Sequence, residues 1–132
     1  MSKQITLSSI ETYLNSILDN VVSKNVYFAK LPDASLVQSS DWTDLVLVDF
    51  PNGVKDFDAY GSGSVFVALY AKPFESGKKN VGKMSQLENA LYSAIENGSN
   101  DRFHIIRNNI YSSYDEGINW HCNVVEILIT IV

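Results

Sequence analysis

The chain has 132 residues, of which 45% are hydrophobic and 19% are charged, values typical of one ordinary globular domain. Its net charge of −5 argues against direct binding to nucleic acid, which depends on clustered lysine and arginine. Its single cysteine, Cys122, excludes an internal disulfide, no apolar stretch is long enough to cross a membrane, and the N-terminus lacks the apolar core of a signal peptide. We therefore expect a single domain over residues 1–132, made in a reducing cytoplasm.

The first predicted element is a helix over residues 9–22. Ser8 and Glu11 have the spacing of a capping box at its start. Its apolar side chains recur at three- and four-residue spacing, which places them on one helical face: Ile10, Tyr13, Leu14, Ile17, Leu18, Val21 and Val22. A helix with such a face must pack against another element.

The middle of the chain predicts strands separated by turns. The expected strands cover residues 25–31, 45–50, 54–57 and 64–71. Residues 33–44 are expected to form a polar loop around Trp42. Asn52 and Gly53 favour a tight turn, because both residue types tolerate positive φ, and residues 54–57 would return from it as a short antiparallel arm.

The second half predicts one helix and two strands. The helix begins near Asn80 or Val81 and ends at Gly98. A strand over residues 102–110, a polar connection over 111–117 and a final strand over 120–132 follow. The order predicts an α+β fold with a mixed, mainly antiparallel sheet of about five to six strands and two main helices packed on one face.

Few residues are arranged for catalysis. The glycines of residues 61–63 precede a strand, whereas a phosphate-binding loop needs a helix N-terminus behind it. His121 and Cys122 are neighbours on a strand and point to opposite faces, although His104 could still approach Cys122 from another strand. We expect no catalytic residue, no cofactor and no enzymatic activity.

The acidic turn region is the main candidate for a cation site, and Asp115 and Glu116 are a weaker one. Asp56 and Asp58 would share one face of a strand, and Asp49 could approach them across the turn. Solvated turn charges are the favoured interpretation, and whether these carboxylates bind a cation stays open. One cysteine and two separated histidines exclude zinc-ligand spacing.

Aromatic and basic residues in loops are the candidates for contacts with other proteins. Tyrosine and tryptophan are enriched in interfaces, because each combines an apolar body with a polar tip. Charged loops direct docking by complementary potentials. The predicted assembly-interface residues are Trp42, Lys72, Phe74, Lys78, Lys79, Lys83, Tyr111 and Tyr114.

The chain resembles the tail-terminator and tail-completion (head–tail joining) proteins of long-tailed bacteriophages. The resemblance lies in the opening helix at residues 9–22, the central strand SVFVALYAK at 64–72, the loop and helix at 80–91, and the final strand entered through WHCN at 120–123. It implies a sheet flanked by helices in a structural virion protein that forms a ring, most often a hexamer. Such a ring caps the tail tube and joins it to the neck. The implied partners are further copies of the chain, the tail-tube protein and neck or connector proteins, without nucleic acid or membrane; the implied location is the virion, after synthesis in the bacterial host cytoplasm.

Two other classes remain open from the residues. One is a small non-enzymatic binding or chaperone-like module that holds a peptide or partner subunit in an exposed apolar groove. The other is a small enzyme that uses the acidic turn. The number of subunits and the station in the tail or neck are not fixed by the sequence.

Overall fold

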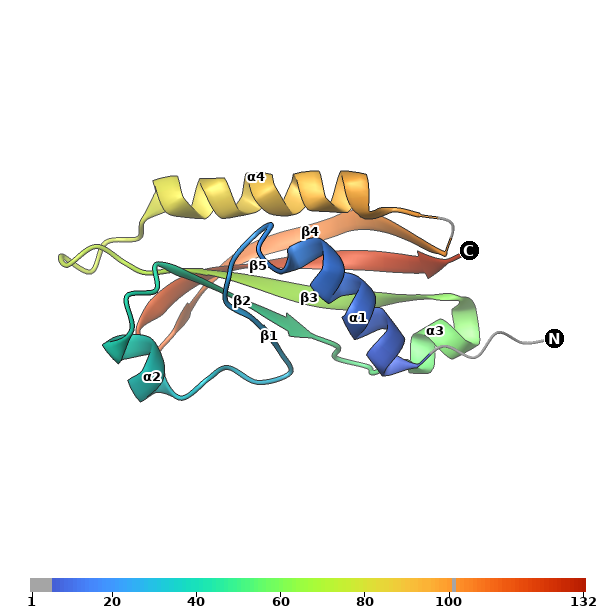
Figure 1. Cartoon of the computed structure of the whole chain (residues 1–132), viewed down its shortest axis with the longest axis horizontal. Helices are drawn as coiled ribbons and strands as arrows, with labels where there is room; N and C mark the ends of the chain where they lie inside the picture. Colours follow the sequence, from blue (N-terminus) through green and yellow to red (C-terminus); the bar gives the residue numbers. More distant parts are fainter. Residues whose placement is uncertain (1–5, 101) are drawn as a thin grey trace.

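The structure is a computed structural model that describes residues 6–100 and 102–132. Within these residues, four helices and five strands follow one another (Figure 1): α1 (Leu7–Leu18), β1 (Val26–Phe28), α2 (Ala34–Ser39), β2 (Asp44–Asp49), α3 (Lys55–Tyr60), β3 (Ser62–Ala71), α4 (Val81–Gly98), β4 (Phe103–Asp115) and β5 (Trp120–Ile131).

The five strands form one sheet in the order β1-β2-β3-β5-β4. β1 is parallel to β2, and every other neighbouring pair is antiparallel. The prediction of a mixed, mainly antiparallel sheet in an α+β fold is confirmed. The two edges of the sheet are therefore the short strand β1 and the long strand β4.

The main core lies between the sheet and the two long helices, α1 and α4, which cover the same face (Figure 1). Alternate residues of the central strands point into it, as the period of two along a strand requires. Each large apolar side chain buried there contributes about 1.5–3 kcal/mol of transfer free energy. The core includes Ile10, Leu14, Leu18, Val65, Val67, Leu69, Met84, Leu87, Leu91, Val125, Ile127 and Ile129.

The first helix begins and ends earlier than predicted. Its capping box is formed by Thr6 and Ser9, not by Ser8 and Glu11: the Ser9 N–H donates to Thr6 Oγ1 at 3.1 Å. The helix ends at Leu18, so Val21 and Val22 lie in the following turn. Val22 is buried there, whereas Val21 is 57% exposed.

The predicted arm over residues 54–57 is wrong, because this segment belongs to helix α3. β2 pairs directly with β3, which leaves residues 54–57 without a strand partner. The helix places Phe57 in the main core, and Gly61 ends it in the left-handed conformation with φ +70°. The predicted polar loop over residues 33–44 likewise contains a helix, α2, which buries Val37.

β4 is longer than predicted, since the segment expected to be a connection, residues 111–117, continues the strand as far as Asp115. A β-bulge between Arg107 and Asn109 shifts its pairing with β5. The turn after β4 is held by Asp115 Oδ1, which accepts from the N–H groups of Gly117 at 2.8 Å and Ile118 at 3.2 Å.

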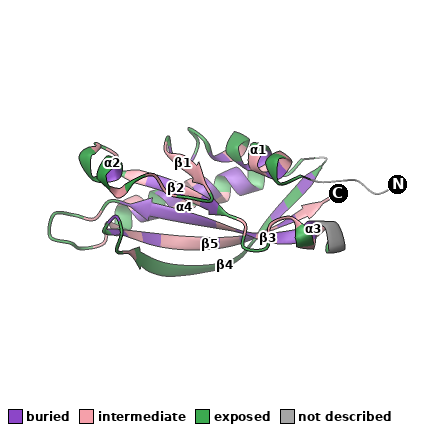
Figure 2. Ribbon diagram, turned by 90° about the horizontal axis from the view of Figure 1, so that it is seen from below, coloured by how far each residue is buried: buried purple, intermediate pink, exposed green. Residues whose placement is uncertain are grey.

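On the opposite face of the sheet, the described residues form a covering layer at one end. There, α2 and the following loop pack on a second apolar cluster that includes Val37, Leu45, Tyr70, Ile118, Trp120 and Cys122. Figure 2, seen from this side, shows β4 mostly exposed along the margin that lies opposite α1 and β1.

Candidate functional site

The register of the sheet brings several chain segments to one end of the molecule. Asp44, Ala71, His121 and Tyr114 are paired in a single row across β2, β3, β5 and β4. The loop after β3, the start of α4 and helix α2 gather at the same end, on the left in Figure 1. We call this region, residues 34–44, 72–83 and 114–121, the loop end.

Seven of the eight predicted interface residues lie in the loop end. They come from three separate stretches of sequence: Trp42 follows α2, Tyr114 is near the end of β4, and the third stretch holds Lys72, Phe74, Lys78, Lys79 and Lys83. The exception is Tyr111, which pairs with Val124 three residues further back along β4. The sequence pointed to these residues singly, and the register of the strands brings the three stretches together.

Two of the four predicted lysines are engaged within the fold. Lys79 Nζ donates to Asn123 Oδ1 at 2.7 Å and to Ser112 Oγ at 3.0 Å. Lys83 Nζ forms an ion pair of 2.9 Å with Asp44 Oδ2, which links α4 to the start of β2. These two amines therefore fasten the base of the loop and have less freedom to meet a partner.

The exposed part of the loop end carries Lys72, Lys78 and Phe74. Both lysines are exposed, and Phe74 leaves 54% of its surface accessible. The loop is nevertheless ordered by its own backbone, because Phe74 N–H donates to the carbonyl of Lys78 at 3.0 Å and Gly77 N–H donates to that of Phe74 at 2.8 Å. A cavity of about 270 Å³ lies beneath it, lined in part by Phe74, Ile118 and Trp120. An exposed aromatic ring above an apolar hollow is a typical feature of protein contact surfaces.

Two further candidate aromatics lie on β4, and one lies beside β1. Tyr111 and Tyr114 are 48% and 46% exposed. Tyr114 makes an edge contact with the His121 ring at 4.9 Å between centroids. Trp42 is half-buried and lies 6.1 Å from the ring of Tyr27, so part of its surface stabilises the fold.

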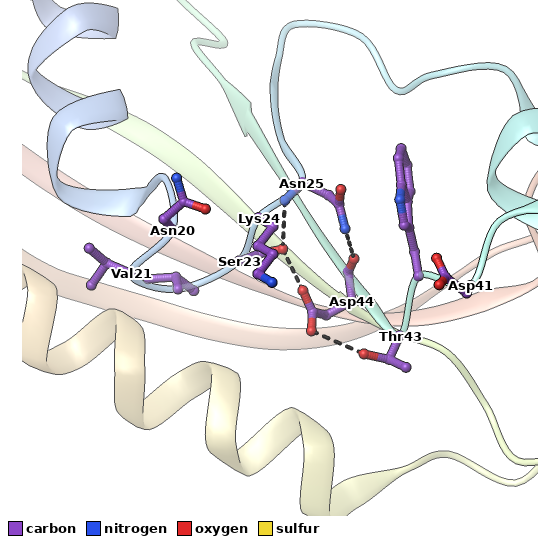
Figure 3. A pocket seen from close by; sticks show the side chains of 10 residues that line it. Asn20, Val21, Ser23, Lys24, Asn25, Asp41, Thr43 and Asp44 are labelled. Atoms are coloured by element: carbon purple, nitrogen blue, oxygen red, sulfur yellow. Dashed lines mark hydrogen bonds between the residues drawn. The ribbon is translucent and has the colours of Figure 1, made fainter.

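A polar pocket of about 440 Å³ adjoins the loop end, between the turn after α1 and the start of β2 (Figure 3). Its central carboxylate, Asp44, is held by a hydrogen bond from Ser23 Oγ, by Thr43 Oγ1 at 3.3 Å and by the ion pair with Lys83. Asn25 Nδ2 donates to the backbone carbonyl of Asp44 at 3.1 Å. The carboxylate is thus occupied by structural partners. Sequence reasoning did not find this pocket, because its two walls are separated by some twenty residues.

A second hollow, of about 570 Å³, runs between α4 and the first half of β4. Tyr92, Ile95 and Ile105 contribute apolar surface to it, and Glu96 and His104 lie at its border. Arg107 projects over the ring of Tyr92, 4.3 Å from its centroid. It is therefore an apolar groove beside an edge strand, a place where an extended peptide could lie.

Cys122 is a buried structural thiol. Burial raises its pKa, and Ser113 and Tyr70 are its hydrogen-bonding neighbours. His104 pairs with Thr130, at the far end of β5, so it does not approach Cys122. Burial, followed by the nearby Cys122 and Asp115, also raises the pKa of Tyr70, whose hydroxyl donates to Asp115 Oδ2 at 3.3 Å. A thiol that resists ionisation is a poor nucleophile.

The acidic turn does not have the predicted arrangement. Asp56 lies in helix α3, and its Oδ2 accepts from Asn52 Nδ2 at 3.1 Å. Asp49 Oδ1 accepts from the N–H of Phe50 at 3.0 Å. The side chain of Asp58 lies outside the described residues. Within the described part of the chain, no three His, Cys, Asp or Glu side chains converge as metal ligands would.

His121 contains the unusual buried polar atom of this region. Its Nδ1 is shielded from solvent and has no hydrogen-bond partner among the described residues. The Tyr114 ring makes an edge contact with the same imidazole. The atom lies within the sheet row described above, and not in one of the hollows.

In the described ranges, 6–100 and 102–132, we find no helix with the length and apolarity needed to span a membrane. Comparison with protein-family models and with curated proteins gives no match to this chain.

Proposed function

We propose that this chain is a structural subunit of a bacteriophage tail, a tail-terminator-like protein that assembles into a closed ring, caps the tail tube and joins it to the neck. The proposal starts from the resemblance in the order of helices and strands. The observed α+β sheet, with α1 and α4 on one face, has the architecture that this resemblance implies. The proposed location is accordingly the virion.

The observation that carries the proposal is the gathering of candidate contact residues in the loop end. Lys72, Phe74 and Lys78 project from an ordered loop, and Tyr114 and Trp42 come from other segments to the same end. Exposed aromatic side chains are enriched in protein contact surfaces, and charged side chains beside them direct docking by complementary potentials. An assembly protein would use such a surface for docking onto the tube or the neck.

The resemblance supplies the number of subunits, six, and the partners. In a ring of identical copies every subunit presents its loop end in the same direction, so the exposed cations and aromatics would repeat around one rim. Repetition multiplies weak contacts into strong attachment, because after the first contact the others are intramolecular. A rim of this kind fits a partner that is itself a ring, such as the end of a tail tube.

Light scattering and sedimentation of the purified chain over a range of concentrations, with and without tail-tube protein, test the proposal. We expect a particle of defined mass, a hexamer, that binds the ends of assembled tubes. A chain that remains a monomer at every concentration and also ignores the tube would contradict the proposal.

Phe74 and Tyr60 provide a matched pair of variants. Both rings are exposed, at 54% and 80%, but Tyr60 lies in α3, away from the loop end. Phe74→Ser should weaken binding to the tube, whereas Tyr60→Ser should leave it unchanged. Equal effects of the two changes would show that the loop end has no special role.

The second candidate function is a module that binds a peptide or a partner subunit without catalysis. The groove between α4 and β4 favours it, since Tyr92, Ile95 and Ile105 offer apolar pockets beside a strand edge. Titration with extended apolar peptides, monitored by nuclear magnetic resonance, would test it. Saturable shifts confined to this groove in a monomeric chain would favour the module over the ring.

A further inference from the structure

The two edges of the sheet correspond residue by residue. Val26 of β1 and Ser112 of β4 lie in one row, joined through Val46, Leu69 and Asn123. The next row joins Tyr27 to Tyr111, and the row after it joins Phe28 to Ile110. If two copies stand side by side at the same level, these residues of one copy meet those of the other.

The directions of the edge strands also agree. β1 is parallel to β2, and three antiparallel steps separate β2 from β4, so β1 and β4 run in opposite directions. A copy placed beside another with its helices on the same side therefore sets β4 antiparallel to β1. An antiparallel pair needs no crossover connection.

The backbone groups that point outward from the two edges belong to residues that would face each other in the pairing. In β1, Asn25 O accepts from Val46 N–H and Ala29 N–H donates to Val48 O, both at 2.8 Å, so the groups of Val26 and Phe28 point outward. In β4, Val132 N–H donates to Arg102 O, which sets the parity before the bulge. The extra residue of the bulge lies in β4, so alternate residues of β5 continue to face β4 beyond it, and their partners there are Asn109, Tyr111 and Ser113. The residues between these, Ile110, Ser112 and Tyr114, therefore point outward. The outward-pointing residues Val26 and Phe28 would therefore lie opposite the outward-pointing residues Ser112 and Ile110, as hydrogen bonding between two antiparallel strands requires.

Two of these outward groups have local partners in the single chain. Ile110 N–H donates to Asn109 Oδ1 at 2.9 Å, and Phe28 O accepts from Lys30 N–H at 2.8 Å. Val26 and Ser112 therefore form the centre of the pairing, where each would donate its N–H to the other's carbonyl. In the pairing of Ile110 with Phe28, the Ile110 N–H and the Phe28 carbonyl would replace these local hydrogen bonds by bonds between the two copies, or would take part in both.

The side chains beside the two edges are complementary. Ile110, which is 38% exposed, would meet Phe28, which lines a hollow of about 360 Å³ with Glu11, Thr12 and Asn15 of α1. On the other face Tyr111 would stand opposite Tyr27. Aromatic and β-branched cross-strand pairs stabilise antiparallel sheets.

Charge adds to this complementarity. Both arginines of the chain, Arg102 and Arg107, lie at the start of the β4 edge, and both are exposed. Arg107 is on the same face of the sheet as Ile110, and Glu11 of α1 borders the hollow that would receive Ile110. Attraction between Arg107 and Glu11 would favour this contact, whereas the exposed Lys24 and Lys30, which flank β1, add no such attraction.

We propose that the β4 edge of one copy pairs antiparallel with the β1 edge of the next copy, Ser112 opposite Val26 and Tyr111 opposite Tyr27, so that the sheets run continuously from subunit to subunit. This inference rests on the proposed ring function, because it supplies the contact between neighbouring subunits. A head-to-tail contact uses two different surfaces, and it closes into a ring when the rotation between copies allows.

Disulfide trapping tests the register. Tyr27 and Tyr111 would form a non-hydrogen-bonded pair, with Cα atoms about 4.5 Å apart, within the about 4.4–6.8 Å that a disulfide spans. Under mild oxidation, a mixture of Tyr27→Cys and Tyr111→Cys chains should give linked dimers, and neither variant alone should do so. The double variant should give a ladder of linked chains. The wild-type chain is the control, because its Cys122 is buried.

Proline at the outward position tests the edge without relying on Tyr27, which packs in the second cluster. Ser112→Pro removes an N–H that points away from β5, which an edge strand tolerates. It should weaken self-association by roughly tenfold or more. Both Ser112→Pro and Ser112→Ala remove the hydroxyl that accepts from Lys79 Nζ. Ser112→Ala keeps the backbone N–H, so it should assemble like the wild type.

The outcomes separate the two proposals. Linked dimers from Tyr111→Cys alone would indicate a symmetric β4–β4 pair and overturn the inference. A wild-type ring that caps tubes, with no trapping in the mixture and no effect of Ser112→Pro, would overturn the inference while the proposed function stands. A wild-type chain that is monomeric and ignores the tube would overturn both.

Discussion

The ring of Phe57 occupies the space that a side chain on Gly63 would need. A Cβ built on Gly63 would lie 2.6 Å from Phe57 Cε2. The close approach of α3 to β3 therefore depends on glycine at this position, and through it Phe57 reaches the main core.

Gly63→Ala should lower the free energy of unfolding by about 1–3 kcal/mol, because the added methyl group forces Phe57 or β3 to move. Urea unfolding followed by circular dichroism measures the change. Gly82→Ala is the control, since its Cβ would meet Asn80 Oδ1 at 3.8 Å and no closer atom; in helix α4 this change should stabilise by about 0.5–1 kcal/mol. Equal stabilities for the two variants would contradict the described packing of α3.

The four lysines around the loop end should divide into two pairs. Lys79→Met and Lys83→Met should lower the melting temperature, because their amines bind Asn123, Ser112 and Asp44 within the fold. The partly exposed pair of Lys83 with Asp44 should contribute about 1 kcal/mol or less, and less still at high salt.

Lys72→Met and Lys78→Met are the matched changes on the same loop. These exposed side chains should alter tube binding and leave the melting temperature unchanged. Differential scanning fluorimetry beside a tube co-sedimentation assay would reveal the division. A common effect of all four substitutions on stability would contradict it.

Stability should fall as the pH rises above about 9. Burial raises the pKa of Tyr70 and of Cys122 in the folded chain, whereas in the unfolded chain these groups ionise near their ordinary values of about 10 and 8.5. Above those values the unfolded state binds fewer protons than the folded state, so alkali favours unfolding. Between pH 9 and 11 the urea midpoint of Tyr70→Phe should decline less steeply than that of the wild type. The difference in slope should correspond to about one ionising group. An unchanged slope would exclude Tyr70 as its source.

The Cys122 thiol should react with iodoacetamide only after unfolding. It is buried in the second cluster, and its pKa is raised by that burial. The rate of alkylation, followed by mass spectrometry, should increase with urea in parallel with the loss of structure. Tyr60→Cys, at a position of α3 that is 80% exposed, should react at once in the folded protein. Rapid modification of Cys122 without denaturant would show that α2 does not protect this cluster.

The elements with strong periodicity were predictable from sequence. The apolar spacing of Ile10, Leu14 and Leu18 and that of Met84, Leu87 and Leu91 depend on neighbours within one helix, and both helices are present. The alternation of Val125, Ile127 and Ile129 likewise identified β5 and its core face.

The elements that depend on distant contacts were not predictable. Val54 and Phe57 have strand-like side chains, but the segment forms α3, in which Phe57 packs against Gly63 of β3, a contact between residues of two different elements. Tyr111 and Tyr114 belong to a strand because they pair with Val124 and His121 of β5, which lie beyond the turn that follows β4. The register of the strands decides that Lys79 and Lys83 contact residues of other elements, and that the candidate interface residues lie at one end of the molecule. No local sequence pattern specifies this register.

The N–H of Val132 donates to the carbonyl of Arg102 at 2.9 Å. This pair lies at the end of the molecule that holds α3, opposite the loop end (Figure 1). A bulky label fused after Val132 would therefore mark one pole of each copy and leave the other untouched. In electron micrographs of labelled particles, density on one side of a ring would give its polarity directly, and its position relative to a bound tube would show which pole docks.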